Sequence, residues 1–417
     1  MNTLSVVIPA LNEEDGIADI MERVLSIKEP LKRVGVEDLE LIVVDDGSKD
    51  RTPEIIQSYP EVVLIQHPVN RGYGAAIKTG FRHARGNLLA FLDADGTYPP
   101  EYYPQLCRPI VEDNADLVIG SRMAGADSEM PLVRRIGNTI FATLVSVISN
   151  RRVTDSASGQ RVLRRDILSN LYPLPDGLNF TPVMSTRAMH EQIKVVEVPI
   201  PYLERVGRSK LSVVEDGMRF LNSILMTALT YNPTRILGMI GTALMGLGVL
   251  STTYRTITRS KASRKDSQLV SWFAGLVLAS AGASIFSIGA LFNYVVSIFH
   301  KRPIRQGVFG TPIFKEPLES RFGWIGVGTI ISGSLFYAVD VWRRWHKPRS
   351  QDVAPWFVPA ASTIMVLTGI QFIASWLLSL VLGELSQREA QTEVDLGQLT
   401  QASEQQQESS SPAKVVA

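Results

Sequence analysis

The stretch Leu88-Leu89-Ala90-Phe91-Leu92-Asp93-Ala94-Asp95 joins a short apolar run to two acidic residues. A continuous apolar run of this length is typical of a strand buried on both faces of a parallel sheet. In an extended chain residues i and i+2 point to the same side, so Asp93 and Asp95 can face one crevice. Neighbouring carboxylates repel each other unless a cation lies between them, and hard oxygen ligands suit Mg²⁺ or Mn²⁺. A solvated acidic turn at Asp95-Gly96 is the alternative.

Strands and helices alternate through the first half of the chain. Apolar runs predict strands at 4–9, 39–44, 62–66, 88–92 and 116–120, and helical spacing predicts helices at 17–25 and 75–84. Such alternation favours a mostly parallel sheet with helices on both faces, and ligands of these sheets bind at the carboxyl ends of the strands. Asp45 and Asp46 follow the second strand as Asp93 and Asp95 follow the fourth.

Four long apolar segments occupy the second half, at about 236–254, 269–299, 324–341 and 356–382. Each is near or above the roughly 20 apolar residues that a helix needs to cross a bilayer core. A soluble helical bundle would need polar residues along one face of each segment, and these are scarce. We therefore predict four membrane spans. Because all the linkers between them are basic, loop charge does not orient the chain.

Two amphipathic stretches precede the membrane segments. The first has an apolar stripe at Val133, Ile136, Ile140, Leu144, Val147 and Ile148. The second places Leu211, Val214, Met218, Leu221, Leu225 and Leu229 opposite Glu215, Asp216, Arg219 and Asn222. Each could be a surface helix packed on the core or a helix lying in the membrane interface. For the second stretch we favour the interface, because membrane segments begin directly after it.

Composition narrows the class of protein. A net charge of +1 gives no whole-chain electrostatic argument for nucleic-acid binding. The single cysteine, Cys107, excludes an internal disulfide framework and fits a reducing compartment. No signal peptide is recognised, since the apolar stretch at 4–11 is short and contains Pro9. We expect a multi-pass protein of the cell membrane with residues 1–205 in the cytosol.

Four motifs occur in a fixed order and carry a family resemblance. They are Val6-Val7-Ile8-Pro9-Ala10-Leu11-Asn12-Glu13, Val43-Val44-Asp45-Asp46-Gly47-Ser48, Asn70-Arg71-Gly72-Tyr73-Gly74-Ala75-Ala76 and Asp93-Ala94-Asp95-Gly96-Thr97-Tyr98-Pro99-Pro100-Glu101. The chain resembles the GT-A fold glycosyltransferases of family 2, and more narrowly the dolichol-phosphate mannose synthases and polyprenyl-phosphate glycosyltransferases. Some prokaryotic members of that group also carry four membrane spans after the catalytic domain.

The resemblance implies a domain organisation. A GT-A catalytic domain would occupy residues 1–208, with an amphipathic helix at about 132–149. A juxtamembrane amphipathic helix would follow at 209–232 and a four-helix transmembrane domain at 233–385. Residues 386–417 are rich in Gln, Ser and Glu, which predicts a disordered polar tail.

The resemblance also implies roles at matching positions. Asp93, Asp95 and Arg122 would be the catalytic residues, and Asp93 and Asp95 would hold Mg²⁺ or Mn²⁺ on the donor diphosphate. A glutamine often follows the acidic pair in relatives, and Thr97 stands there as a third candidate metal contact. The nucleotide sugar would contact Pro9, Leu11, Asn12, Glu13, Asp45, Asp46, Lys78, Asp93, Ala94 and Asp95.

Basic residues suggest the acceptor. Arg122 follows the fifth strand, Arg134 and Arg135 open the first amphipathic stretch, and Arg208 and Lys210 precede the second. In the related synthases arginines at such places hold the lipid phosphate, which guanidinium binds bidentately. Attraction of juxtamembrane charge to anionic lipid is the alternative, and it is equally good for all of these residues except Arg122.

A phosphate acceptor also explains why no general base is evident. A phosphate monoester has a second pKa of about 6 and is already ionised at pH 7, whereas a sugar hydroxyl needs a base. The five histidines lie in no acidic or motif setting. We therefore expect an inverting transfer of one hexose from a nucleotide sugar, of GDP-mannose or UDP-glucose type, to polyprenyl phosphate. The motifs do not distinguish the donors, and oligomeric state is open.

Two other functions compete with this one. A processive polysaccharide synthase typically carries Q-x-x-R-W, but here Ser158-Gly159-Gln160-Arg161-Val162 stands at the comparable point and no tryptophan occurs before Trp272. A non-catalytic membrane scaffold with the same fold need not keep Asp45, Asp93, Asp95 and Arg122 together.

Overall fold

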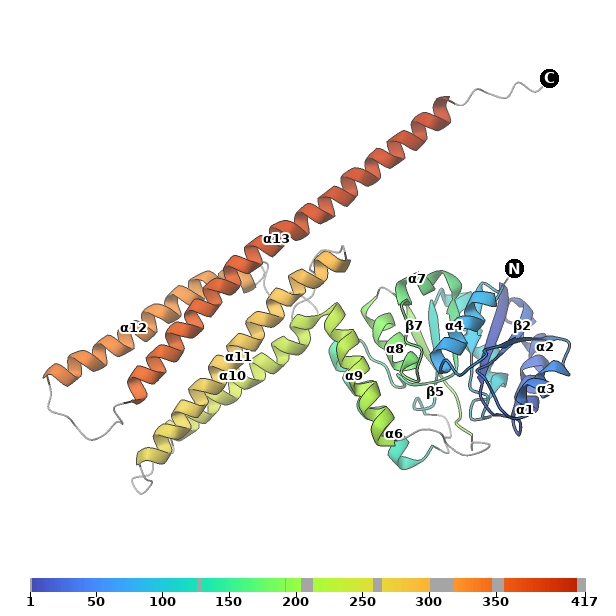
Figure 1. Ribbon diagram of the computed structural model, residues 1–417, viewed down its shortest axis with the longest axis horizontal. Coiled ribbons are helices and arrows are strands. Elements are labelled where there is room, and N and C mark those ends of the chain that lie inside the picture. Colours follow the sequence, from blue (N-terminus) through green and yellow to red (C-terminus); the bar gives the residue numbers. More distant parts are fainter. Residues whose placement is uncertain are drawn as a thin grey trace. The chain divides into compact units, whose positions relative to one another are not determined.

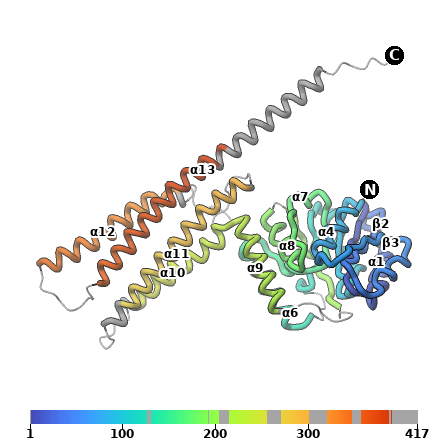
Figure 2. Tube along the Cα trace, in the orientation of Figure 1, coloured from blue at the N-terminus to red at the C-terminus, as the bar shows by residue number. Residues whose placement is uncertain are grey.

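The computed structural model describes residues 2–125, 130–191, 193–203, 213–257, 265–300, 318–346 and 356–410. The chain forms two compact units, Met1–Ala228 and Leu229–Ala417 (Figures 1 and 2).

The first unit is built on a mixed sheet of seven strands in the order β3-β2-β1-β4-β6-β5-β7. Their bounds are β1 Asn2–Ala10, β2 Val36–Asp45, β3 Val62–Gln66, β4 Leu88–Phe91, β5 Leu117–Ser121, β6 Arg161–Arg164 and β7 Val195–Pro199. β6 is antiparallel to β4 and β5, and the other four pairings are parallel, which confirms the predicted mostly parallel sheet. β6 and β7 were not predicted, because arginines stand at both ends of the four-residue strand β6 and Glu197 interrupts β7.

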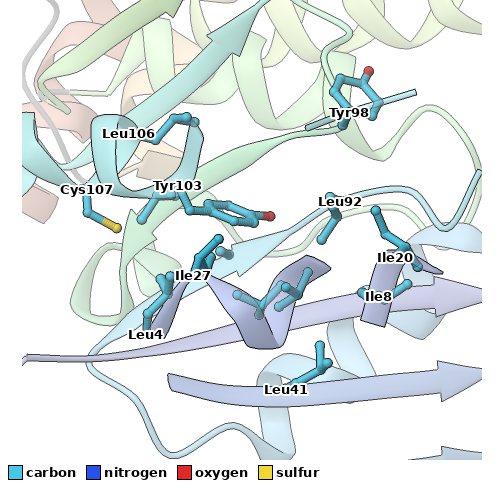
Figure 3. Close-up of a cluster of buried hydrophobic side chains, with 14 of the residues drawn as sticks. Leu4, Ile8, Ile20, Ile27, Leu41, Leu92, Tyr98, Tyr103, Leu106 and Cys107 are labelled. Carbon is cyan, nitrogen blue, oxygen red and sulfur yellow. The ribbon is translucent and has the colours of Figure 1, made fainter. Parts of the chain in front are cut away.

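Helices cover both faces of this sheet (Figure 1). Their bounds are α1 Ile17–Ser26, α2 Lys28–Lys32, α3 Thr52–Gln57, α4 Tyr73–His83, α5 Tyr103–Asp113, α7 Leu168–Leu171 and α8 Phe180–His190, with 3-10 turns η1 Pro100–Tyr102 and η2 Arg165–Ile167. Residues of β1, α1 and α5, among them Leu4, Ile20 and Leu106, form the apolar cluster on one face (Figure 3). On the other face Gly80 lets α4 approach Val7, since a Cβ there would meet the valine side chain at 2.3 Å.

Helix α6, Leu132–Ser149, turns its apolar stripe outward. Ile136 is 53% exposed and Ile140 58% exposed, while the helix packs on its unit through Asn138, Ala142 and Val145. Of the two alternatives left open for this stretch, packing of the stripe on the core holds only at Ile148, which is buried, and in part at Leu144, which is half-buried. Because α6 packs on its unit through small and amide side chains, its larger apolar side chains form a broad exposed face.

Helix α9, Val213–Tyr231, also exposes apolar side chains. Val214 is 77% exposed and Met218 61% exposed. Asp216, which the sequence places on the outward polar face, is buried, because α9 packs through this side of the helix together with Ile224.

The second unit contains two antiparallel helical hairpins. The first joins α10 Pro233–Ile257 to α11 Lys265–His300, and the second joins α12 Phe322–His346, preceded by η3 Leu318–Arg321, to α13 Phe357–Ser410. Glycines let the paired backbones approach closely, Gly241 against Gly282 in the first hairpin and Gly326 against Gly369 in the second. The pattern Gly-x-Ile-Gly-x₆-Gly-x-Leu occurs at 238–250 and again at 323–335, so the first helices of the two hairpins repeat one another.

Five described helices are long and apolar enough to cross a membrane, by length and composition: 132–149, 233–254, 270–299, 322–346 and 357–385. The four predicted segments are among them, and α6, predicted as an amphipathic stretch, is a fifth helix that meets this criterion. Of the tail expected to be disordered at 386–417, the residues up to Ser410 continue helix α13, and 411–417 lie outside the described residues. Gln, Glu, Ala and Leu are good helix formers, and extending an existing helix needs no new nucleus.

Candidate active site

A cavity of about 250 Å³ opens in the first unit between the carboxyl end of β4, the residues after β5, and helices α6, α8 and α9. Its polar lining includes Asp93, Asp95, Thr97, Arg122 and Arg134. The apolar lining comprises Met130, Val133, Phe141, Leu178 and Phe220, among others. The cavity therefore combines three carboxylates, because Asp216 of α9 also lines it, and two guanidinium groups with an apolar wall that comes largely from α6 and α9.

The two carboxylates of the acidic step are held by neighbouring hydroxyls. The Tyr73 hydroxyl donates to Asp93 Oδ1 at 2.7 Å. Burial and the charge of Asp93 raise the pKa of Tyr73 well above its usual value, so this phenol stays a donor. Asp95 Oδ1 accepts the Thr97 backbone N–H at 3.1 Å and the Thr97 hydroxyl at 2.6 Å. The Thr97 hydroxyl, predicted as a metal contact, thus orients Asp95.

The donor set fits a divalent ion that completes its coordination with substrate. Among the described residues no group of three or more His, Cys, Asp and Glu side chains could hold a metal ion. Two carboxylates in one cavity nevertheless suit Mg²⁺ or Mn²⁺, which usually take one or two carboxylates together with waters and substrate phosphates.

Gly159 lies directly against the Asp93 carboxylate, and we say that it backs this side chain. A Cβ at this position would lie 2.7 Å from Asp93 Oδ2 and 2.9 Å from Oδ1. Since Asp93 is held on its other side by Tyr73, a methyl group would displace the carboxylate. The sequence around Gly159 carries no local signal of this contact, because the contact joins distant parts of the chain.

Gly159→Ala is therefore expected to lower sugar transfer about 10- to 100-fold and to raise the Mn²⁺ concentration that gives half-maximal rate. Gly246→Ala is the control, because a Cβ there would meet no atom within 4 Å. Titration of the initial rate with Mn²⁺ measures both variants. An unchanged half-saturating Mn²⁺ concentration in Gly159→Ala would contradict the backing role.

Arg122 is fixed by a buried carboxylate that sequence reasoning missed. Its Nε donates to Asp155 Oδ2 at 2.7 Å and its Nη2 to Asp155 Oδ1 at 2.8 Å. Asn138 also donates to Asp155 Oδ1. The guanidinium lies 5.5 Å from the ring centre of Tyr98 and 5.6 Å from that of Tyr202. Burial alone would raise the pKa of Asp155, but the charge and hydrogen bonds of Arg122 outweigh it and hold this pKa below its usual value.

The other arginines and the lysine that were predicted to bind the lipid phosphate do not share one location. Arg134 lines the cavity and donates to the Tyr202 hydroxyl at 3.4 Å. Arg135 is exposed and does not line the cavity. Arg208 and Lys210 lie outside the described residues.

The predicted nucleotide contacts lie at the neighbouring strand ends. β1 pairs with both β2 and β4, so the carboxyl ends that carry Asn12, Asp45 and Asp93 stand side by side. The Asn12 side chain accepts the Lys49 N–H at 2.8 Å, and Asp45 accepts the Ser48 N–H at 3.0 Å, which fixes the two loops together. The cavity lining does not include Pro9, Leu11, Asn12, Glu13, Asp45, Asp46, Lys78 or Ala94.

Asp46 and Lys78 have structural partners. Asp46 is buried and accepts the backbone N–H groups of Arg71 and Gly72, while its Oδ1 lies 2.6 Å from His67 Nδ1. The expectation that every histidine lacks an acidic or motif setting is therefore wrong for His67, because the sheet brings β2 and β3 together. Lys78 donates to the Leu174 carbonyl at 2.8 Å and pairs with Asp176.

Comparison with known proteins gives two family matches: residues 5–172 match Glycosyl transferase family 2, and residues 233–393 match a domain of unknown function, DUF8752. The chain is 34% identical over 252 residues to the low-salt glycan biosynthesis hexosyltransferase Agl6 of Haloferax volcanii, covering 60% of this chain and 58% of that protein. It is 31% identical to a dolichyl-phosphate hexose transferase of the same organism, covering 54% of this chain and 94% of that protein.

A bacterial relative covers more of this chain. The undecaprenyl-phosphate 4-deoxy-4-formamido-L-arabinose transferase of Photorhabdus laumondii is 30% identical over 316 residues, which is 73% of this chain and 92% of that protein. Among solved structures, glucosyl-3-phosphoglycerate synthase from Mycobacterium tuberculosis with Mn²⁺, uridine diphosphate and phosphoglyceric acid aligns at a TM-score of 0.45 and 20% identity, covering 54% of this chain and 78% of that chain.

The chain has two carboxylates at a strand end of a mixed α/β sheet, and it is similar in sequence to these transferases. Together these features indicate an enzyme that transfers a sugar. The chain belongs to glycosyltransferase family 2.

Proposed function

We propose that the protein transfers one hexose from a nucleotide sugar to polyprenyl phosphate, with inversion at the anomeric carbon. The observation that carries this proposal is the cavity in which Asp93 and Asp95 share one space with Arg122 and Arg134. Relatives named as dolichyl-phosphate and undecaprenyl-phosphate transferases support a lipid phosphate as acceptor. The donor is of GDP-mannose or UDP-glucose type.

On the donor side, Asp93 and Asp95 would hold Mg²⁺ or Mn²⁺ against the diphosphate. The ion, when bound, supplies positive charge that stabilises the departing nucleoside diphosphate. Tyr73 and Thr97 hold the two carboxylates in place through the hydrogen bonds described above. The residues at the ends of β1 and β2, among them Asn12 and Asp45, would contact the nucleoside.

On the acceptor side, Arg122 and Arg134 would position the lipid phosphate. Two nitrogens of Arg122 are engaged by Asp155, and among the described residues Nη1 has no hydrogen-bond partner. Asp155 therefore fixes the plane of the guanidinium, which binds phosphate through fixed N–H directions. An ionised phosphate oxygen needs no general base to attack the anomeric carbon, so the absence of histidine from the cavity lining fits this acceptor.

The lipid chain would reach the cavity between α6 and α9. Both helices expose apolar side chains, and α9 leads in the sequence directly into α10, the first of the long apolar helices of the second unit. We therefore place both helices in the membrane interface and assign the four helices of 233–385 to the bilayer. Residues 1–208 would be the catalytic domain on the cytosolic side.

The proposed reaction is tested with the full chain in vesicles that contain polyprenyl phosphate, presented in turn with GDP-mannose and UDP-glucose. Release of nucleoside diphosphate is measured with Mn²⁺ and with excess chelator. We expect release from one donor, dependent on both the lipid phosphate and the ion. Release that is independent of polyprenyl phosphate would contradict the acceptor assignment.

Placing a charge on the exposed face of α6 is expected to weaken use of a lipid acceptor. Ile140→Glu would raise the apparent KM for polyprenyl phosphate in vesicles about 10-fold, because a carboxylate at an apolar lipid surface costs on the order of 1–2 kcal/mol. The control is Val63→Glu, which changes another exposed apolar side chain on edge strand β3. Equal KM values for the two variants would contradict the interface assignment.

A further inference from the structure

Arg161 is the largest fully buried side chain of the described residues, with an exposed fraction of 0%. It begins β6, where its backbone pairs with Phe91 of β4 and Ile119 of β5. Its backbone therefore lies between the two strands that lead to Asp93 and Arg122. Arg161 does not line the cavity.

The guanidinium is held by carbonyl groups alone among the described residues. Nε donates to the Ser158 carbonyl and Nη2 to the Ser156 carbonyl, both at 2.9 Å. Nη1 has no hydrogen-bond partner there, and Arg161 forms no ion pair with a described carboxylate. Burial lowers the pKa of Arg161 to about 10, so it remains charged at neutral pH. The charge of Asp155 offsets part of the burial, but a buried guanidinium that no carboxylate contacts directly is still costly to a fold, and this cost favours a specific task.

The carbonyl groups belong to the loop 155–160, which touches both halves of the site. At one end Asp155 holds Arg122 through two hydrogen bonds. At the other end Gly159 backs Asp93 and donates its N–H to the Tyr98 hydroxyl at 2.7 Å. Between them the Ser158 hydroxyl donates to the Gly120 carbonyl at the end of β5. One short loop thus sets the positions of the carboxylate and the guanidinium.

We propose that Arg161 is a positioning residue that clamps loop 155–160, so that Gly159 backs Asp93 while Asp155 fixes Arg122. The clamp acts through two backbone carbonyls and touches no substrate. This proposal rests on the proposed transfer reaction for its effect on rate. The proposal predicts that replacing Arg161 raises two concentrations needed for half-maximal rate, that of Mn²⁺ and that of polyprenyl phosphate.

The chain offers a matched control in Arg165. This arginine likewise donates from Nε and Nη2 to two backbone carbonyls, those of Gly86 and Ala84, at 2.8 and 2.7 Å. It follows the opposite end of β6 and does not line the cavity. Arg165→Met therefore removes the same kind of contact away from the site.

The experiment compares Arg161→Met, Arg161→Lys and Arg165→Met in the full chain reconstituted in vesicles. For Arg161→Met we expect the half-saturating Mn²⁺ concentration and the apparent KM for polyprenyl phosphate both to rise about 10- to 100-fold, as for other residues that orient a metal ligand. Arg161→Lys should restore part of both, because an ammonium group can donate to two carbonyls. Arg165→Met should change neither.

Two further measurements do not depend on turnover. Amide hydrogen exchange of peptides covering 155–160 should be faster in Arg161→Met than in wild type and Arg165→Met, and binding of Mn²⁺ alone should be weaker. If wild type transfers no sugar, the proposed function fails while these measurements still decide the clamp. Should Arg161→Met not fold, Arg161→Lys carries the comparison. Unchanged loop exchange, or unchanged metal and acceptor requirements, would overturn the proposal.

Discussion

Replacing Asp95 by Asn is expected to lower sugar transfer about a thousandfold without unfolding the protein. A bound divalent ion contributes several kcal/mol of charge stabilisation, and each 1.36 kcal/mol is about a tenfold change in rate. The amide keeps one oxygen that can still accept from Thr97, so the local turn should survive. Initial rates at saturating Mn²⁺, with thermal unfolding as the check on folding, measure the effect.

Asp50→Asn is a matched control for this change. Asp50 Oδ1 accepts the backbone N–H of Thr52 at 3.0 Å and its hydroxyl at 2.6 Å, which is the arrangement at Asp95 and Thr97. Asp50 does not line the cavity. A rate loss in Asp95→Asn that is no larger than that in Asp50→Asn would mean that the carboxylate of Asp95 does not hold the ion.

The second large effect concerns stability. Asp155→Ala is expected to reduce the free energy of unfolding by about 3–5 kcal/mol, because it leaves the buried guanidinium of Arg122 without its carboxylate. The matched control is Asp166→Ala, which breaks the pair of Arg164 and Asp166. Both side chains of that pair are substantially exposed, and such surface pairs contribute little. Chemical denaturation of the detergent-solubilised chain compares the two variants, and equal losses would contradict the role of Asp155.

Acid should remove part of this stabilisation in wild type. Because the pKa of Asp155 is lowered in the folded protein, its contribution is complete above the unfolded value of about 3.9 and is lost as the pH falls through the lowered pKa. The difference in unfolding free energy between wild type and Asp155→Ala should therefore be constant near neutral pH and shrink in acid. A difference that grows on acidification would contradict the assignment.

The sequence was most informative where the signal is local. An apolar run followed by Asp93 and Asp95 predicts a strand end with two carboxylates, and the structure places both in one cavity. Arg122 was found in the same way, because it comes directly after the fifth predicted strand. The exposed apolar faces of α6 and α9 agree with helical stripes that can be read from residue spacing.

Contacts across the sheet gave no such signal. Asp155 and Gly159 lie in a loop of small residues, and their importance follows from the antiparallel strand β6, which was not predicted. The buried contact between Asp46 and His67 likewise depends on the pairing of β2 with β3. Asp216 is on the polar face of α9 by spacing, but it is buried, whereas Glu215, Arg219 and Asn222 of the same face are exposed. Long-range packing decided each of these positions.

The central claim is that one cavity brings a divalent ion on the acidic pair to a lipid phosphate held by arginine. Its most direct test is transfer of a labelled hexose from the nucleotide sugar to polyprenyl phosphate by the full chain in vesicles, followed by extraction into organic solvent. The account predicts a labelled lipid whose formation needs Mn²⁺ or Mg²⁺ and is lost in Asp95→Asn. Labelled lipid formed equally well in excess chelator, or label found only on water-soluble glycan, would contradict it.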